Sequence, residues 1–152
     1  MKDRLFWQGK NIVITGASSG IGKAILLLLK DIDCNIYTLN RQTLPLTFPH
    51  TAKITQISCD ISQEEQIQAA VASIQKDFKI LDVLFNNAGI TAHGRFDRMD
   101  FSVFHSTFAI NFFGTVYLTK LLIEEIKAAQ GTIITTSTVS GLYGIPGRSV
   151  YS

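Results

Sequence analysis

The sequence predicts an α/β protein whose strands form one doubly wound parallel sheet. Short apolar runs rich in β-branched residues alternate along the chain with segments of helical periodicity, and this alternation is the pattern of βαβ units. The chain has 152 residues and is 46% hydrophobic, which is enough apolar material for the core of one domain. Because crossovers between parallel strands are right-handed, these units favour a doubly wound topology.

The first predicted elements are a strand, a turn and a helix. Asn11–Thr15 reads N-I-V-I-T, a run typical of a strand that is buried on both faces. Residues 21–30 carry the apolar side chains of a helix, and their run I-L-L-L-L is too short to span a bilayer. The charged stretch before Asn11 lacks the apolar segment of a signal peptide, and we expect it to lead directly into the strand.

Four more strands are predicted after this helix. They are short runs at residues 35–39, 54–59, 81–85 and 132–136. Because no further strand follows in the sequence, we expect the sheet to be truncated after the fifth strand, which then forms an exposed parallel edge. Residues 1–152 are thus expected to be a single domain that is incomplete at its C-terminal end.

Two further helices are predicted between these strands. The sequence S-Q-E-E from Ser62 to Glu65 matches a capping box, so a helix is expected to begin at Ser62. Its apolar residues recur at helical spacing: Ile67, Ala70, Val71 and Ile74. Residues 102–128 form a longer helical pattern, and a break is expected near Asn111 because Asn is unfavourable within a helix.

Charge and cysteine content argue against several classes of function. The net charge is +2 and Lys and Arg form no stripe, which argues against nucleic acid as a partner. Cys34 and Cys59 form no C-x-x-C pair and no metal-binding pattern, and both are expected to be buried free thiols. Free thiols suit a reducing compartment, so we expect a cytoplasmic protein with no membrane partner.

A glycine-rich turn, T-G-A-S-S-G-I-G, joins the first predicted strand to the first helix. Glycine lets the backbone turn tightly and approach a pyrophosphate, and the helix N-terminus offers free N–H groups to it. The turn therefore predicts a nucleotide site, with a purely structural turn as the alternative. The predicted contacts are Gly16, Ser18, Ser19, Gly20, Ile21 and Gly22.

The spacing of this turn points to one family. T-G-x-x-x-G-x-G differs from the common G-x-G-x-x-G and resembles the cofactor fingerprint of the short-chain dehydrogenase/reductase family. The sequence N-N-A-G after the fourth strand resembles the second fingerprint of that family, with a polar turn as the alternative. The resemblance implies a Rossmann fold, and it implies cofactor contacts at Asn87, Ala88 and Gly89.

The resemblance also implies roles for positions beside these fingerprints. Asp60, followed by Ile61, stands where the family has an acid that contacts the adenine ring; a simple acid preceding a helix is the alternative. Asn111 stands where the family has an Asn that bends the long helix and helps to hold a proton-relay water. The alternative for Asn111 is a polar side chain that bonds within its own helix.

Hydroxyl groups follow the fifth predicted strand. Tyr151 matches the family's Tyr, which donates or accepts the proton that hydride transfer to a carbonyl requires. The family's Ser lies thirteen residues earlier, where this chain has Thr138; Ser137 and Ser140 are the alternatives, and an ordinary polar loop would explain all three. The family's Lys, four residues after the Tyr, would be residue 155, beyond the last residue of this chain.

The end of the second strand favours NADP over NAD as the cofactor. NAD sites place an Asp or Glu about 20 residues after the glycine turn, where it binds the ribose 2′-OH. This chain has Asn40 there, followed by Arg41. An Arg binds a 2′-phosphate bidentately whereas an acid repels it, so we expect NADP, with a solvated surface Arg as the alternative.

The expected function is that of an oxidoreductase that transfers a hydride between NADP(H) and a small-molecule carbonyl or alcohol. The alternative is a truncated, non-catalytic remnant that binds nucleotide, and the 152-residue chain alone is expected to lack activity. The helix predicted over 102–128 has apolar residues on more than one face, and family members commonly associate through this helix. The complete protein is therefore expected to be a homo-oligomer.

Overall fold

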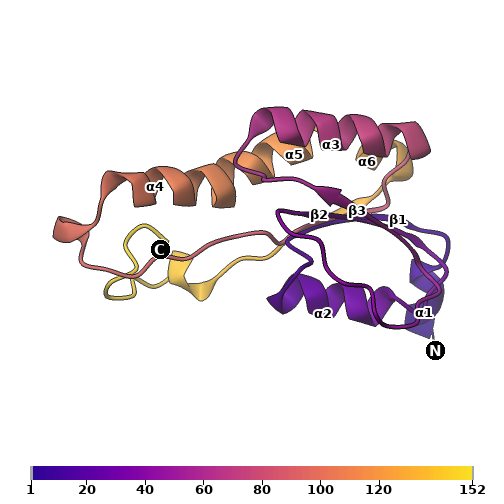
Figure 1. Cartoon of the computed structure of the whole chain (residues 1–152), viewed down its shortest axis with the longest axis horizontal. Coiled ribbons are helices and arrows are strands. Elements are labelled where there is room, and N and C mark those ends of the chain that lie inside the picture. Colours follow the sequence, from indigo (N-terminus) through magenta and orange to yellow (C-terminus); the bar gives the residue numbers. More distant parts are fainter. Residues whose placement is uncertain (1, 152) are drawn as a thin grey trace.

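The computed structural model describes residues 2–151, which form one parallel sheet with helices on both faces (Figure 1). The strand order is β3-β2-β1-β4-β5. The strands are β1 Asn11–Thr15, β2 Asn35–Asn40, β3 Lys53–Ser58, β4 Val83–Asn86 and β5 Thr132–Thr135. Because this order runs outward from β1 in both directions, the structure confirms the predicted doubly wound Rossmann sheet.

All five strands lie within two residues of their predicted positions. β1 is buried along its whole length because it pairs with β2 on one side and with β4 on the other. β5 pairs only with β4 in the described part of the chain, and its four residues are exposed, which confirms the predicted edge. All pairs are parallel, so the carboxyl ends of the strands lie at one side of the sheet.

The helices form two layers. Helices α1 Lys2–Trp7 and α2 Gly20–Leu29 lie on one face, and α3 Glu64–Asp77, α5 Thr115–Leu121 and α6 Ile123–Ala129 lie on the other (Figure 1). The prediction of a direct lead into β1 is wrong because α1 precedes it. The indole of Trp7 stacks on Phe85 of β4 with ring centroids 6.1 Å apart. Helix α1 is too short to show a helical periodicity in the sequence, so the sequence alone did not reveal it.

The predicted capping box at Ser62 is also wrong. Helix α3 begins at Glu64 after Gln63, which makes no side-chain cap. Ser62 instead donates to Asp60, through its N–H at 2.9 Å and through its hydroxyl at 2.8 Å, both to Oδ1. The Ser62 hydroxyl is therefore bonded to the Asp60 carboxylate and does not cap the helix. The predicted buried face of α3 is confirmed by Ile67, Ala70, Val71 and Ile74.

The predicted long helix is interrupted twice. Helix α4 Phe101–Phe108 passes into a π-helical segment, Ala109–Gly114, which contains Asn111, and this confirms the predicted break. A second bend of 58° separates α5 from α6. Among residues 2–151 no single helix is long and apolar enough to cross a membrane, although the stretch Phe101–Leu121 taken together with α6 across this bend meets the requirement by length and composition alone. Its Leu118, Leu122 and Ile126 are buried in the core.

The sheet divides the hydrophobic core into two clusters. One includes Leu84 and Leu118 and lies on the α3 side, and the other includes Ile14 and Leu26 and lies on the α2 side. Cys34 and Cys59 are buried free thiols, as predicted. Burial raises the pKa of Cys34 and of Cys59 to about 11, and the charge of the neighbouring Asp adds to this rise. Neither thiol is therefore a nucleophile near neutral pH.

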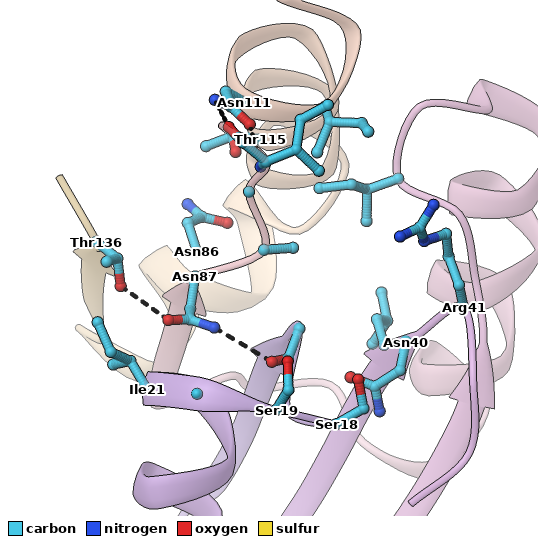
Figure 2. Close-up of a pocket in the computed structure, with 18 of the residues that line it drawn as sticks. Ser18, Ser19, Ile21, Asn40, Arg41, Asn86, Asn87, Asn111, Thr115 and Thr136 are labelled. Carbon is cyan, nitrogen blue, oxygen red and sulfur yellow. Dashed lines mark hydrogen bonds between the residues drawn. The ribbon is translucent and has the colours of Figure 1, made fainter. Parts of the chain in front are cut away.

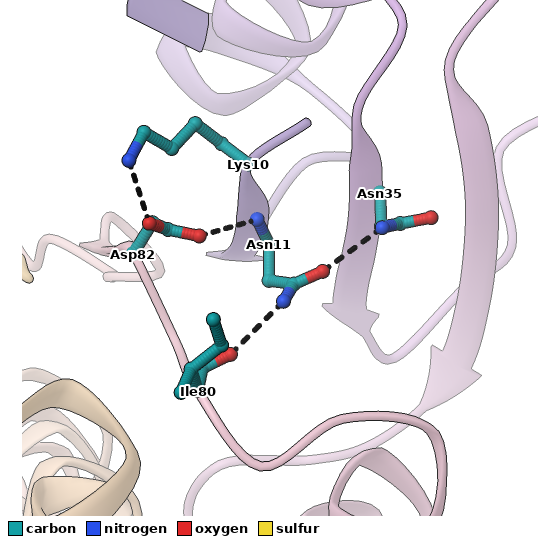
Figure 3. Close-up of polar contacts among 5 residues, drawn as sticks. All are labelled: Lys10, Asn11, Asn35, Ile80 and Asp82. Atoms are coloured by element: carbon teal, nitrogen blue, oxygen red, sulfur yellow. Dashed lines mark hydrogen bonds and ion pairs between the residues drawn. The ribbon is translucent and has the colours of Figure 1, made fainter. Parts of the chain in front are cut away.

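A polar cluster ties the strands together at the side of the sheet opposite the strand carboxyl ends (Figure 3). Asp82 accepts from the Lys10 ammonium at 2.7 Å and from the Asn11 N–H at 2.8 Å. The Asn11 amide donates to Ile80 O at 3.1 Å and accepts from the Asn35 amide at 2.9 Å. The side chain of Asp82 is only 12% exposed. Little water could therefore take the place of its carboxylate as the acceptor for Lys10 and the Asn11 N–H.

We expect Asp82→Ala to lower the free energy of unfolding by about 2–3 kcal/mol, because it leaves the half-buried Lys10 and the buried Asn11 N–H without their acceptor. Chemical denaturation measures this loss. Asp97→Ala is the matched control, because its ion pair with Arg95 is exposed at both ends. Equal stability of the two variants would contradict the assignment of Asp82 to the structural core of the sheet.

Candidate dinucleotide and active site

A cleft of about 1000 Å³ opens at the carboxyl ends of β1, β2, β4 and β5. All of the predicted site residues except Gly22 line it. On the cofactor side these are Gly16, Ser18, Ser19, Gly20, Ile21, Asn40, Arg41, Asp60, Ile61, Asn87, Ala88 and Gly89, and on the catalytic side Asn111, Ser137, Thr138 and Tyr151. Residues predicted from separate parts of the sequence therefore face one cleft, and Gly22 lies buried beneath it.

Each glycine of the turn has its own geometric reason. Gly16 has a φ of +69°, and a Cβ on it would lie 2.9 Å from the Cα of Ala88. A Cβ on Gly22 would overlap Gly16 O and lie 2.5 Å from Asn87 Nδ2. Gly20 has a φ of +52° and no neighbour within 4 Å of its Cβ position. Two glycines thus allow close packing, and the third leaves open space above the turn.

The N-terminus of α2 points its free N–H groups at this space. Ser19 precedes the helix with an extended backbone and makes no side-chain cap, and the first turn holds no acidic residue. Free N–H groups and the positive end of the helix dipole suit an anion. The open space at Gly20 lets the backbone approach that anion closely. The residues present therefore fit the pyrophosphate of a dinucleotide.

Asn87 connects three strands at the centre of the cleft (Figure 2). Its amide donates to Thr15 O at 3.0 Å, and its Oδ1 accepts from the Thr136 hydroxyl at 3.1 Å. The Thr15 hydroxyl accepts from the N–H groups of Asn87 and Ala88, each at 2.9 Å. Thr15 and Thr136 lie within the predicted motifs at the ends of strands, and the structure shows that both bind Asn87, a contact for which neither was singled out.

Asn40 and Arg41 lie at the other end of the cleft from Thr136 (Figure 2). Asn40 is 4% exposed, and its Oδ1 has no hydrogen-bond partner in the described part of the chain. Such an orphaned buried acceptor is unusual, and a bound ribose hydroxyl would satisfy it. The structure places Asp60 in both of its predicted settings, because it lines the cleft and also precedes α3.

Asn111 anchors the long helix to the loop after β4. Its Oδ1 accepts from Ile90 N at 2.8 Å, and its Nδ2 donates to Ile90 O at 2.8 Å. The side chain thus bonds another segment rather than its own helix, which rules out that alternative. These bonds occupy the Asn111 amide and explain why a residue unfavourable in helices lies at the π-helical segment.

The hydroxyl groups after β5 differ in their accessibility. Thr138 and Ser137 line the cleft, whereas Ser140 is buried and does not. The Thr138 hydroxyl donates to Ser140 Oγ at 3.2 Å and accepts from Ser140 N at the same distance. Ser140 is therefore placed to orient the hydroxyl of Thr138 and not to meet a ligand.

Tyr151 lines the cleft next to a cation. Its N–H donates to Arg148 O at 2.8 Å, and the Arg148 guanidinium lies 6.0 Å from the centre of the Tyr151 ring. The same guanidinium donates to the hydroxyl of Thr91 at 3.1 Å. Thr91 lines the cleft as well, so Arg148 connects the two loops that meet there.

Comparison with known proteins decides the family. Residues 10–152 match the short chain dehydrogenase family, which is nearly the whole chain. The chain belongs to this family. The match includes the glycine turn, N-N-A-G and Tyr151, which is consistent with the fold and the resemblance described above.

Several short chain dehydrogenases and related oxidoreductases resemble this chain in detail. An uncharacterized oxidoreductase of Thermotoga maritima is 33% identical over 96% of this chain and 60% of its own length. The 3-oxoacyl-(acyl-carrier-protein) reductase FabG of the same organism is 30% identical over 95% of this chain and 62% of its own length. A short chain dehydrogenase from Leptospira borgpetersenii with bound NAD+ shares the fold, with a TM-score of 0.87 at 22% identity, over 95% of this chain and 59% of that one. The chain thus spans about three fifths of the length of these relatives.

Proposed function

We propose that the full-length protein is an NADP-dependent oxidoreductase that transfers a hydride between NADP(H) and a carbonyl or alcohol substrate. The observation that carries this proposal is that one cleft collects the glycine turn, N-N-A-G and the hydroxyl groups of Thr138 and Tyr151. When bound, the nicotinamide supplies or accepts the hydride. The residues of this chain bind the dinucleotide, orient the carbonyl and move the proton.

Each polar side chain at the substrate end of the cleft has a role in this proposal. The Tyr151 hydroxyl donates a proton to the carbonyl oxygen during reduction and accepts it during oxidation. On substrate binding the hydroxyl of Thr138 turns its one hydrogen from Ser140 Oγ to the same oxygen, with Ser137 as the alternative donor beside it. Asn111 holds the loop after β4 through Ile90, which keeps the substrate end of the cleft in place.

The preference for NADP rests on the end of β2. Neither Asn40 nor Arg41 is acidic, so no carboxylate of these two residues repels a 2′-phosphate. Arg41 is exposed at the cleft and makes no ion pair within residues 2–151, which leaves its guanidinium available to a phosphate. The side-chain amide of Asn40 carries both a hydrogen-bond donor and an acceptor. It can therefore bind a ribose whose 2′ position bears either a hydroxyl or a phosphate.

Arg41→Asp tests the proposal in the full-length protein. We expect the dissociation constant for NADPH to rise by about a hundredfold, because the variant loses a charged donor and gains a repelling carboxylate. The dissociation constant for NADH should change much less, and fluorescence titration measures both. An unchanged preference between the two nucleotides would show that Arg41 is only a surface residue. Turnover of a carbonyl substrate with NADPH separates an enzyme from a protein that binds nucleotide without catalysis.

We also propose that the full-length protein is a homo-oligomer. The segment from α4 to α5 exposes several large apolar side chains, and these are Phe101, Phe108, Phe112, Phe113 and Val116. Exposed apolar patches of this kind mark interfaces. We expect light scattering at micromolar concentration to give a multiple of the chain mass, and Phe112→Glu to shift it toward the monomer. A wild-type monomer would contradict the proposal.

A further inference from the structure

The connection from β2 to β3 contains no helix, although it joins two parallel strands. Residues 41–52 cross the edge of the sheet on the α2 side as an irregular segment. Leu44 and Ala52 are buried in the core cluster on that side, and Leu46 and Phe48 pack against it. A segment without backbone hydrogen bonds of its own needs side chains to hold it in one conformation.

Gln56 of β3 supplies such a contact. The N–H of Leu44 donates to Gln56 Oε1 at 2.7 Å, and Gln56 Nε2 donates to Leu44 O at 2.8 Å. The side-chain amide thus satisfies both backbone groups of one residue, as a neighbouring strand would. Both bonds are partly buried, and the side chain of Leu44 is 8% exposed. The Gln56 side chain on β3 therefore fixes the position and the orientation of the Leu44 backbone.

Residues 41–43 consequently lie between two residues whose positions are fixed by their contacts. Asn40 is the last residue of β2 and is buried, and Leu44 is clamped by Gln56. Every residue from Asn40 to Pro45 lines the cleft. Gln56 itself does not line the cleft, so it reaches a ligand only through the backbone of this loop.

We propose that Gln56 is a positioning residue for the 2′-phosphate of NADP. By clamping Leu44 it holds Arg41 and Thr43 at the rim of the cleft, where a guanidinium and a hydroxyl donate to phosphate oxygens. Without the clamp, the three-residue span samples many conformations, and ordering it on binding lowers the affinity. This inference rests on the proposed function, because the 2′-phosphate is the group that distinguishes NADP from NAD.

Binding of 2′,5′-ADP and 5′-AMP to the full-length protein tests the inference, since the two ligands differ only in the 2′-phosphate. For Gln56→Leu we expect the dissociation constant for 2′,5′-ADP to rise about tenfold, as for the loss of a well-placed charged hydrogen bond, and that for 5′-AMP to stay nearly unchanged. Gln75→Leu is the matched control. It loses a hydrogen bond of 2.8 Å to Glu125 on the other face of the sheet and should leave both constants unchanged.

Two further variants make the test independent of how well Gln56→Leu folds. Gln56→Glu keeps the acceptor for Leu44 N and loses the donor to Leu44 O, so we expect a smaller loss of 2′,5′-ADP affinity. In an Arg41→Met background, Gln56→Leu should have little further effect, because the two residues act on one phosphate. Hydrogen exchange at the Leu44 amide measures the clamp without any ligand. It should become faster in Gln56→Leu, which removes the acceptor of Leu44 N, and should change less in Gln56→Glu, which keeps that acceptor.

The outcomes separate this inference from the proposed function. If the wild-type protein binds 2′,5′-ADP no more tightly than 5′-AMP, both the NADP assignment and the role of Gln56 are overturned. If the wild-type preference persists in Gln56→Leu although Leu44 exchanges faster, only the role of Gln56 is overturned. An equal loss for both ligands would likewise overturn it, because it would show a general effect on the fold.

Discussion

Replacement of Tyr151 by Phe is expected to lower turnover of the full-length protein by about 10²–10⁴-fold, the range that a positioned general acid or base contributes. Phe keeps the ring that lies beside the Arg148 guanidinium and removes only the hydroxyl that we propose as the proton donor. Binding of NADPH should change little, because the glycine turn and the end of β2 are untouched. Steady-state kinetics with a carbonyl substrate, combined with NADPH titration, measure both quantities.

Tyr143→Phe is the control for this experiment. Tyr143 follows the same strand, but it is 72% exposed and does not line the cleft. Its hydroxyl should therefore be dispensable for turnover. If Tyr151→Phe retained wild-type turnover, the proton would have to come from another group, and Thr138 and Ser137 are the remaining hydroxyl groups of the predicted set at this end of the cleft.

The second large effect is expected from Gly16→Ala. Its backbone has a φ of +69°, and the new Cβ would lie 2.9 Å from the Cα of Ala88, a backbone atom that cannot move by changing rotamer. We expect the free energy of unfolding to fall by about 3 kcal/mol, the sum of a left-handed backbone and a steric clash. Affinity for 5′-AMP should also fall, by about tenfold or more, because the clash displaces the turn that faces the pyrophosphate.

Gly9→Ala separates the two causes. Gly9 has a similar φ of +73°, but its Cβ position has no neighbour within 4 Å and lies outside the cleft. This variant should lose only about 1 kcal/mol of stability and keep its affinity for nucleotide. Equal losses in the two variants, measured by chemical denaturation, would show that contact with Ala88 contributes nothing at Gly16.

Much of the site was predictable because its residues follow strands. Gly16, Asn87 and Thr138 all lie just beyond the end of a predicted strand, and parallel strands end at one side of the sheet. Their meeting in one cleft thus followed from the element order alone. The hydrogen bonds of Thr15 and Thr136 to Asn87 were not predicted, because they join strands distant in the sequence.

The misplaced elements share one physical origin. The S-Q-E-E sequence satisfies the capping pattern, yet Asp60 competes for the Ser62 hydroxyl and the helix starts later. Helix α1 depends on the stacking of Trp7 on Phe85, a residue of another strand. Local patterns describe which conformations are available, and the tertiary partner selects among them.

The sequence by itself determined the order of the five strands and of the helices between them, the glycine turn and the identity of the hydroxyl groups, because periodicity and glycine act through neighbouring residues. Only the tertiary structure revealed that Asn111 bonds Ile90, that Ser140 is buried behind Thr138 and that Gln56 clamps Leu44. The contacts of Asn111 and Gln56 join separate segments whose approach depends on how the whole sheet packs, and the burial of Ser140 depends on it as well. A hydrogen bond between such segments leaves no periodic trace in the sequence, so it emerges only when the chain is folded.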